Sequence, residues 1–167
     1  TLFLGEVYGQ TPDPRVREAL VKAVRLIVST QNDEGGWRYH PVPFDADISV
    51  TICQIMALRS ARNAGLSVPK ETIDRAVAYV RQCQNSDGGF KYMLNSGGSA
   101  FSRSAAGVAS LYYAGIDEDN AVRHGLDYLM AHYNQVTVRS GHYYYGQYYA
   151  VQAMFLAGGP YWRKWFP

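Results

Sequence analysis

The sequence of 167 residues predicts an all-α protein built from three helical hairpins. A phrase occurs twice, because "AVRLIVSTQNDEGGWRY" from Ala23 and "AVAYVRQCQNSDGGFKY" from Ala76 share seven of seventeen residues at a spacing of 53. Three apolar segments each end in Ala-Gly, at Gly65, Gly115 and Gly158. No alternation of apolar and polar residues is long enough to predict a sheet.

The first helix of each predicted hairpin is amphipathic. In residues 13–31, Asp13 suits an N-cap, Pro14 suits the first helical position, and apolar residues follow at helical spacing. In residues 68–84, Pro69 marks the first turn in the same way. Both segments run into Gly-Gly, which lets a helix stop in a left-handed conformation. The third copy, residues 119–133, lacks this ending.

The second helix of each hairpin is less polar and covers residues 47–65, 99–115 and 142–158. Aligning the three Ala-Gly ends pairs Gln54 with Ser104 and Gln147. We therefore expect a single domain over residues 1–167, with hairpins at about 13–65, 69–115 and 119–158.

The repeated phrase has a structural interpretation. A helix end leaves backbone carbonyl groups without partners and needs a turn to close it. The glycines supply the turn, and the Gln and Asn amides can bond to the backbone ends. The ring of Trp37 or Phe90 can cover the junction with the next hairpin.

Composition excludes several classes of partner. The net charge is +2 with no block of like charge, so we expect no nucleic-acid surface. The longest apolar stretches are too short to span a membrane. The two cysteines, Cys53 and Cys83, have no zinc-binding spacing, and we expect no metal and no cofactor. Nothing in the sequence indicates a compartment.

The repeated phrase resembles the QW motif of squalene and hopene cyclases and of protein prenyltransferase β-subunits. The motif is carried here by Gln31-Gly35-Gly36-Trp37 and by Gln84-Gly88-Gly89-Phe90. The resemblance implies an α/α toroid, an outer ring of helices around an inner ring. It places the helices that end near Gln31, Gln84 and Tyr133 outside, and those that end in Ala-Gly inside, lining a central cavity.

The resemblance also implies that this toroid is partial, because a full ring holds more hairpins. The chain ends "TLFLGEVYG" and "GGPYWRKWFP" are rich in large apolar groups, and the second stands where a further outer helix would begin. Terminal repeats normally need a polar outer face. We therefore expect a partner, either further hairpins of a longer parent chain or another subunit.

Asp45 and Asp47 resemble part of the D-x-D-D motif of class II terpene cyclases. By this likeness Asp47 matches the proton donor and Asp45 the first position, whereas Ile48 replaces the last aspartate. Protonating an alkene needs a carboxylic acid that is kept neutral in an apolar pocket. Asp47 also stands where a helix N-cap belongs, and a polar ligand contact at the cavity mouth is a third interpretation.

The zinc chemistry of protein prenyltransferases is not matched. Their Asp-x-Cys pair does not occur here, and Tyr145 falls where their histidine belongs. Asp47, Cys53 and His142 are the only conceivable zinc-binding trio, and their spacing argues against it. The Gly-Cys-Gly-Glu-Gln signature of thioester domains is also missing.

Polysaccharide cleavage is another chemistry found on toroids. A lyase needs a Tyr or His base and a cation to neutralise a uronate, and such residues stand near inner-helix starts. Alternatively, the tyrosine cluster simply covers a helix end. Asp45 and Asp47 are too close in the chain for the opposed carboxylates of an inverting glycosidase. Residues that we expect to bind a ligand are Arg103, His142, Tyr144, Tyr145, Gln147 and Tyr148.

The favoured interpretation is a repeat-type scaffold whose aromatic concave face binds an apolar or mixed small molecule. The alternative is a terpenoid-cyclase-like or polysaccharide-lyase-like enzyme that is completed by sequence outside this chain. The sequence leaves open whether the protein is an enzyme.

Overall fold

The computed structural model describes residues 1–95 and 97–166, and within them it contains helices but no strand. An isolated bridge between Gln84 and Phe90 is the one β-type pairing there. The predicted all-α class is therefore confirmed. The helices in chain order are α1 (Leu2–Gln10), α2 (Pro14–Ser29), α3 (Ile48–Asn63), α4 (Lys70–Gln82), α5 (Phe101–Tyr113), α6 (Asn120–His132), the short η1 (Tyr133–Gln135), α7 (Tyr143–Ala157) and α8 (Gly159–Trp165).

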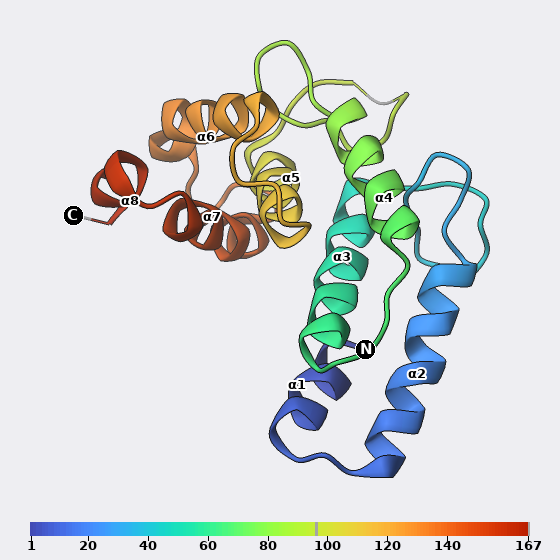
Figure 1. The fold of residues 1–167 in the computed structure, drawn as a ribbon. Helices are drawn as coiled ribbons and strands as arrows, with labels where there is room; N and C mark the ends of the chain where they lie inside the picture. The colour runs from blue at the N-terminus through green and yellow to red at the C-terminus, as the bar shows by residue number, and fades with distance from the viewer. Residues whose placement is uncertain (96, 167) are drawn as a thin grey trace.

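The helices form two layers. The inner layer is α1, α3, α5 and α7, each packed on the next, and the outer helices α2, α4, α6 and α8 each contact an inner neighbour. The chain follows a curve from α1 and α2, in blue, to α7 and α8, in red (Figure 1). The curve does not close, which agrees with a partial toroid.

Helix α5 lies at the centre of the inner layer. Its small residues let neighbouring helices approach closely, and ten of its thirteen residues are buried. At Gly107 a Cβ would press against the ring of Phe90. The outer helices are amphipathic instead, as α2 shows by burying Leu20, Val24 and Ile27 on one face.

Both chain ends add a helix to the six that the pattern predicts. Helix α1 packs on α3, where the Ser60 hydroxyl donates to Glu6 Oε1 at 2.9 Å and to the Leu2 carbonyl at 3.3 Å. Helix α8 begins where a further outer helix was expected. The Trp165 ring stacks on Phe101 with centroids 6.3 Å apart, so this end is partly covered by the chain itself.

The repeated turns are built by the same hydrogen bonds. Gln31 Nε2 donates to the carbonyls of Gly35 at 2.8 Å and Thr72 at 2.9 Å. Gln84 Nε2 donates to the carbonyls of Gly88 at 2.9 Å and Ala121 at 2.8 Å. Each glutamine thus ties the end of one outer helix to the first turn of the next. The structural interpretation of the phrase is confirmed.

Glycine is required at the first position of each Gly-Gly pair. Gly35 has φ of 96° and Gly88 has φ of 85°, in the left-handed region. A Cβ on Gly35 would also collide with the carbonyl oxygen of Arg75, and one on Gly88 with that of His124. These close approaches let the next outer helix lie directly on the turn.

The aromatic residue of each turn anchors the inner helix. The backbone N–H of Trp37 donates to Thr51 Oγ1 at 3.2 Å, and the backbone N–H of Phe90 donates to Ser104 Oγ at 2.8 Å. Thr51 is therefore the counterpart of Ser104. The alignment of Ala-Gly ends, which paired Gln54 with Ser104, is shifted by one turn because α3 has 16 residues and α5 has 13.

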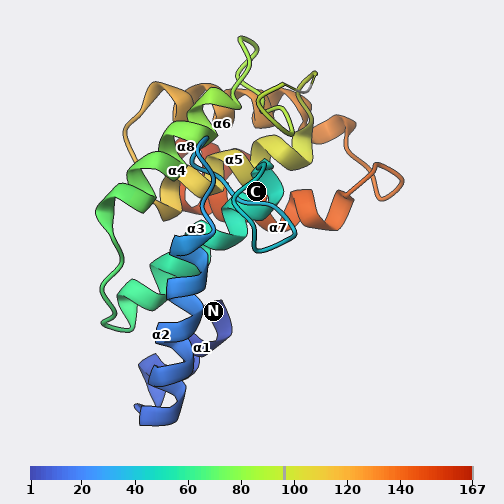
Figure 2. The same ribbon diagram turned by 90° about the vertical axis from the view of Figure 1, so that its right-hand side faces the viewer.

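Viewed after a quarter turn, the loop that precedes α5 lies at the opposite end of the molecule from α1 and α2 (Figure 2). The first turns of α3, α5 and α7 are brought to the same region. Within the described part of the chain, no helix has the length and apolar character needed to cross a membrane.

Candidate ligand-binding cavity

A cavity of about 400 Å³ lies where the first turns of α3, α5 and α7 meet. It is walled by residues of these turns and by one tyrosine from each repeated turn. The lining residues are Tyr39, Ser49, Val50, Cys53, Tyr92, Ser102, Arg103, His142 and Tyr145.

The structure brings together three of the expected ligand-binding residues, Arg103, His142 and Tyr145. Tyr144 and Tyr148 lie outside this cavity on the exposed face of α7, with 77% and 52% of their surface accessible. Gln147 is half-buried and is not part of the lining. Ligand binding by these six residues stays a prediction.

Two donors in the cavity wall lack partners among the described residues. Arg103 Nη2 donates to the Gly98 carbonyl at 3.0 Å, but Arg103 Nε is buried without an acceptor. The Tyr145 hydroxyl is also buried without a hydrogen bond within ordinary limits. Burial raises the pKa of Tyr145, and the neighbouring Ser49 side chain offsets part of this rise. Buried polar groups in native proteins normally have a partner, so these two mark a polar spot in the cavity.

His142 holds the start of α7 in an unusual conformation. Its φ of 61° and ψ of 32° lie in the left-handed region, which is uncommon for a residue with a side chain. Its side chain forms no cap hydrogen bond with α7, and it lines the cavity. Such strained positions are frequent at functional sites, and the strain costs on the order of 1–3 kcal/mol.

Asp47 is the N-cap of α3, as one of its three interpretations predicts. Its Oδ1 accepts from the backbone N–H groups of Ser49 at 2.8 Å and Val50 at 2.9 Å. The side chain is fully buried. Its Oδ2 has no hydrogen bond among the described residues and lies 3.9 Å from Arg38 Nε.

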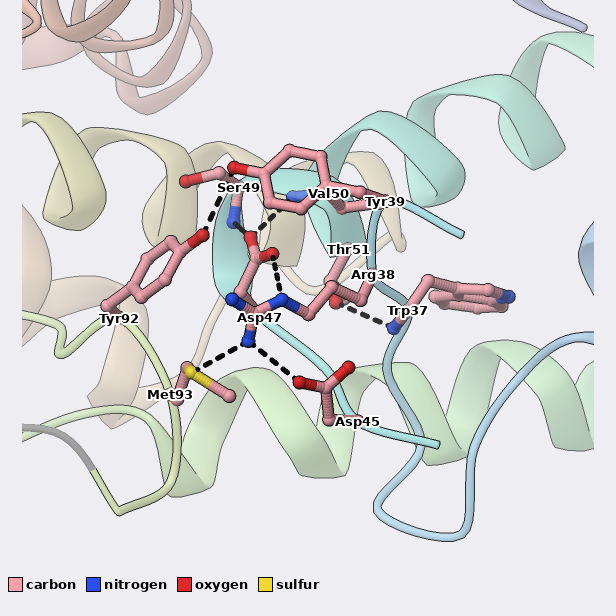
Figure 3. Close-up of polar contacts among 10 residues, drawn as sticks. All are labelled: Trp37, Arg38, Tyr39, Asp45, Asp47, Ser49, Val50, Thr51, Tyr92 and Met93. Carbon is pink, nitrogen blue, oxygen red and sulfur yellow. Dashed lines mark hydrogen bonds and ion pairs between the residues drawn. The ribbon is translucent and has the colours of Figure 1, made fainter. Parts of the chain in front are cut away.

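Arg38 joins both aspartates to the two tyrosines of the repeated turns (Figure 3). Its Nη1 donates to Asp45 Oδ2 at 2.9 Å, and its guanidinium carbon lies 5.8 Å from the ring centroids of Tyr39 and Tyr92. The two tyrosine hydroxyls are 3.1 Å apart. Burial, then the hydrogen bond with Tyr39, raises the pKa of Tyr92. This network closes the wall of the cavity on the side of Asp47.

The arrangement suits Asp47 as a charged cap better than as a proton donor. An acid that protonates an alkene must be neutral before it reacts. Two backbone N–H groups donate to Asp47 at the start of α3, and Arg38 lies 3.9 Å away, which are the contacts of a helix cap. The acid role of Asp47 and Asp45 stays a prediction, to which these contacts give little support.

The described residues contain no group of three His, Cys, Asp or Glu side chains that could hold a metal ion. Cys53 and His142 line the same cavity, but Asp47 faces Arg38. That no metal or cofactor is bound stays a prediction.

Six lining residues were not among those expected to bind a ligand, although Cys53 was considered as a zinc ligand. Tyr39 and Tyr92 end the two copies of the repeated phrase, and this recurrence is the sequence feature that could have marked them as lining residues. The others depend on which way the first turn of each inner helix faces, which no motif marks. These are Ser49, Val50, Cys53 and Ser102.

Two layers of helices joined by repeated Gln–Gly-Gly–aromatic turns define an α/α toroid repeat protein. The family model of the squalene-hopene cyclase C-terminal domain matches residues 4–167, so the chain belongs to that family. It is a terpenoid-cyclase-type repeat domain. A search of curated proteins found no match to the chain.

Proposed function

We propose that this domain is a scaffold whose concave aromatic face binds a small molecule with an apolar body. The observation that supports the proposal is the cavity at the inner-helix starts. Its volume of about 400 Å³ falls within the usual range for ligand sites, about 300–1,000 Å³. Its tyrosines come from both repeated turns and from α7, so the repeat itself assembles the wall.

The lining fits a mixed rather than a purely apolar ligand. The rings of Tyr39, Tyr92 and Tyr145, with Val50, offer apolar surface. Arg103 and the two serines offer donors and acceptors at the same place. A few convergent polar groups in an aromatic cavity are the usual way to orient a bound molecule.

A lyase-like enzyme is the second candidate, since Arg103, His142 and Tyr145 line one cavity. A tyrosine phenol is protonated near neutral pH, and burial raises the pKa of Tyr145 further, so Tyr145 is a poor base. His142 would then have to take the proton. The scaffold proposal needs no such step, and we prefer it.

We further propose that another hairpin of the same repeat type covers α7. Helices α3 and α5 each have an inner helix on both sides, whereas α7 packs mainly on α5 and has no further inner helix on its other side among the described residues. The uncovered face is an apolar stripe at helical spacing, made of Tyr144, Tyr148, Val151 and Phe155. An exposed stripe of this kind marks an interaction surface. Continuation of the repeat in a longer parent chain is the occupant that we favour.

The scaffold proposal is tested by filling the cavity. Val50→Trp places a large ring in the lining, and Val151→Trp adds the same ring on the exposed stripe of α7 as a control. Octanoate and octan-1-ol serve as probes in calorimetric titrations of the whole chain, and thermal melts check folding. We expect Val50→Trp to abolish binding of the probes and Val151→Trp to retain it. A folded Val50→Trp protein that binds as tightly as the parent would refute the proposal.

A further inference from the structure

We propose that the polar end of the bound molecule is an anionic oxygen group, held by Arg103 and Tyr145. This inference rests on the proposed function, because it concerns the ligand of the same cavity. It assigns a chemical class, an organic anion with an apolar body, which the fold alone does not imply.

The first argument comes from donors that lack acceptors. Four buried side-chain atoms have no partner among the described residues, and two of them, Arg103 Nε and Tyr145 Oη, belong to residues lining this cavity. An Arg Nε–H group can only donate, so its missing partner must be an acceptor. Leaving such a buried donor unpaired costs on the order of 1–3 kcal/mol, which a ligand oxygen would recover.

The second argument comes from charge. Arg38 is neutralised by Asp45 at 2.9 Å and faces Asp47 at 3.9 Å. Arg103 forms no ion pair within the described residues, and its contact with Gly98 involves a neutral carbonyl. The cavity wall therefore contains one guanidinium without a counter-charge. Arg38 is shared by Asp45 and Asp47, so one negative charge remains on that side of the cavity, and Arg103 forms no ion pair with either aspartate among the described residues.

The third argument comes from the helix starts that form the cavity. Helix α3 has Asp47 as its cap, but α5 begins after Ala100 and α7 begins after His142, and neither residue gives a side-chain cap. Free N–H groups and the positive end of the helix dipole favour an anion at such a terminus. These effects add to the unpaired Arg103 at the same spot.

The experiment compares octanoate with octan-1-ol, which share a chain and differ in charge. Calorimetry on the whole chain at pH 7.5 should show octanoate binding at least tenfold tighter. Arg103→Gln should abolish this preference and leave octan-1-ol binding as it was. Arg62→Gln is the matched control, because Arg62 lies outside the cavity in the last turn of α3. Octyl phosphate is the third probe. If it binds more tightly than octanoate, the anionic group of the ligand is assigned as a phosphate.

Failure of the inference and failure of the proposed function are distinguishable. Equal binding of octanoate and octan-1-ol by the parent chain overturns the anion and leaves the cavity as a binding site. Binding of neither probe refutes the proposed function itself. An octanoate preference that survives in Arg103→Gln also overturns the inference. If that variant melts at a much lower temperature, Tyr145→Phe replaces it and should weaken octanoate several-fold without changing octan-1-ol.

Discussion

The two repeated turns, residues 31–37 and 84–90, have the same construction and different surroundings. In each, the glutamine side-chain amide donates to a glycine carbonyl and to a carbonyl of the next outer helix, and the backbone N–H of the aromatic residue donates to a hydroxyl of the inner helix. The shared residues are therefore those that hold the helices together. Their repetition reflects the geometry of the hairpins and not a catalytic requirement.

The turns differ at the start of the inner helix that follows. Asp47 caps α3 with two hydrogen bonds, whereas Ala100, its counterpart 53 residues later, leaves α5 without a side-chain cap. The first copy thus neutralises its helix start internally. The second copy leaves a helix start and Arg103 facing the cavity. The comparison teaches that function in this fold is to be sought where the copies diverge.

The largest effect should come from the glycine that both turns share. Gly35→Ala forces a side chain into the left-handed region and against the Arg75 carbonyl, so we expect a loss of about 3 kcal/mol of unfolding free energy. Gly65→Ala has a similar φ but open space around the Cβ, and should cost about 1 kcal/mol. Urea denaturation measures both. Equal losses would show that the close approach does not matter.

Replacing either glutamine should lower the free energy of unfolding, and the loss should be larger for the more buried one. Gln31 is buried and Gln84 only half-buried, although both make two hydrogen bonds. Gln31→Leu leaves two carbonyls unsatisfied away from water and should cost about 2–3 kcal/mol, and Gln84→Leu about half as much. Urea denaturation of both variants is the check. A larger loss for Gln84→Leu would break the proposed equivalence of the turns.

The C-cap residue of the outer helix is Thr30 in the first copy and Cys83 in the second. Burial raises the pKa of the Cys83 thiol from its ordinary 9.0 to about 11. The thiol of the unfolded chain ionises at lower pH than the buried thiol. The contribution of Cys83 to the free energy of unfolding is therefore fully present below pH 9 and falls by about 2 kcal/mol as the pH rises to 11.

Cys83→Thr installs the residue of the first copy and should remove about 2 kcal/mol of the fall in stability between pH 9 and pH 11, whereas the buried tyrosines with raised pKa values keep the remainder. Cys53→Ala, which removes an exposed thiol, is the control and should leave the pH profile unchanged. Denaturation at several pH values gives the profile. An unaltered profile in Cys83→Thr would mean that other groups cause the alkaline loss.

The smallest effects should come from exchanging the caps. Asp47→Ala should cost about 1 kcal/mol, whereas Asp47→Asn retains a capping oxygen and should change stability little. Ala100→Asp should stabilise α5 by up to about 1 kcal/mol, since the backbone there already has the extended conformation of an N-cap. Thermal melts resolve these differences. Loss of a measured cyclase activity in folded Asp47→Asn would instead assign Asp47 as an acid.

Much of the fold was predictable because helix patterns are local. The six helices of the three hairpins follow from apolar spacing, caps and glycines, and the cap at Asp47 follows from its place before α3. Helix α1 was missed because its two glycines, Gly5 and Gly9, weaken the helical signal. Gly5 is needed for close contact with Ser60, which the sequence does not reveal.

The cavity was only partly predictable because its walls come from distant segments. Arg103, His142 and Tyr145 were expected at inner-helix starts, and the structure places them together. Tyr144 belongs to the same tyrosine-rich run but precedes Tyr145 directly and points to another side of the helix, and Tyr148 lies one turn further along α7 in a hollow beside α1 and α3. Tyr39 and Tyr92 line the cavity with their rings against Arg38, and no local sequence pattern predicts this tertiary contact.

One measurement tests most directly whether the repeated turns are structural and the divergent helix starts bind the ligand. Amide chemical-shift changes on adding octanoate to the whole labelled chain locate the binding site. We predict changes at residues 49–53, 102–103 and 142–145 and at Tyr39 and Tyr92, with residues 31–37 and 84–90 unaffected. Changes confined to the repeated turns, or to the exposed stripe of α7, would contradict the account.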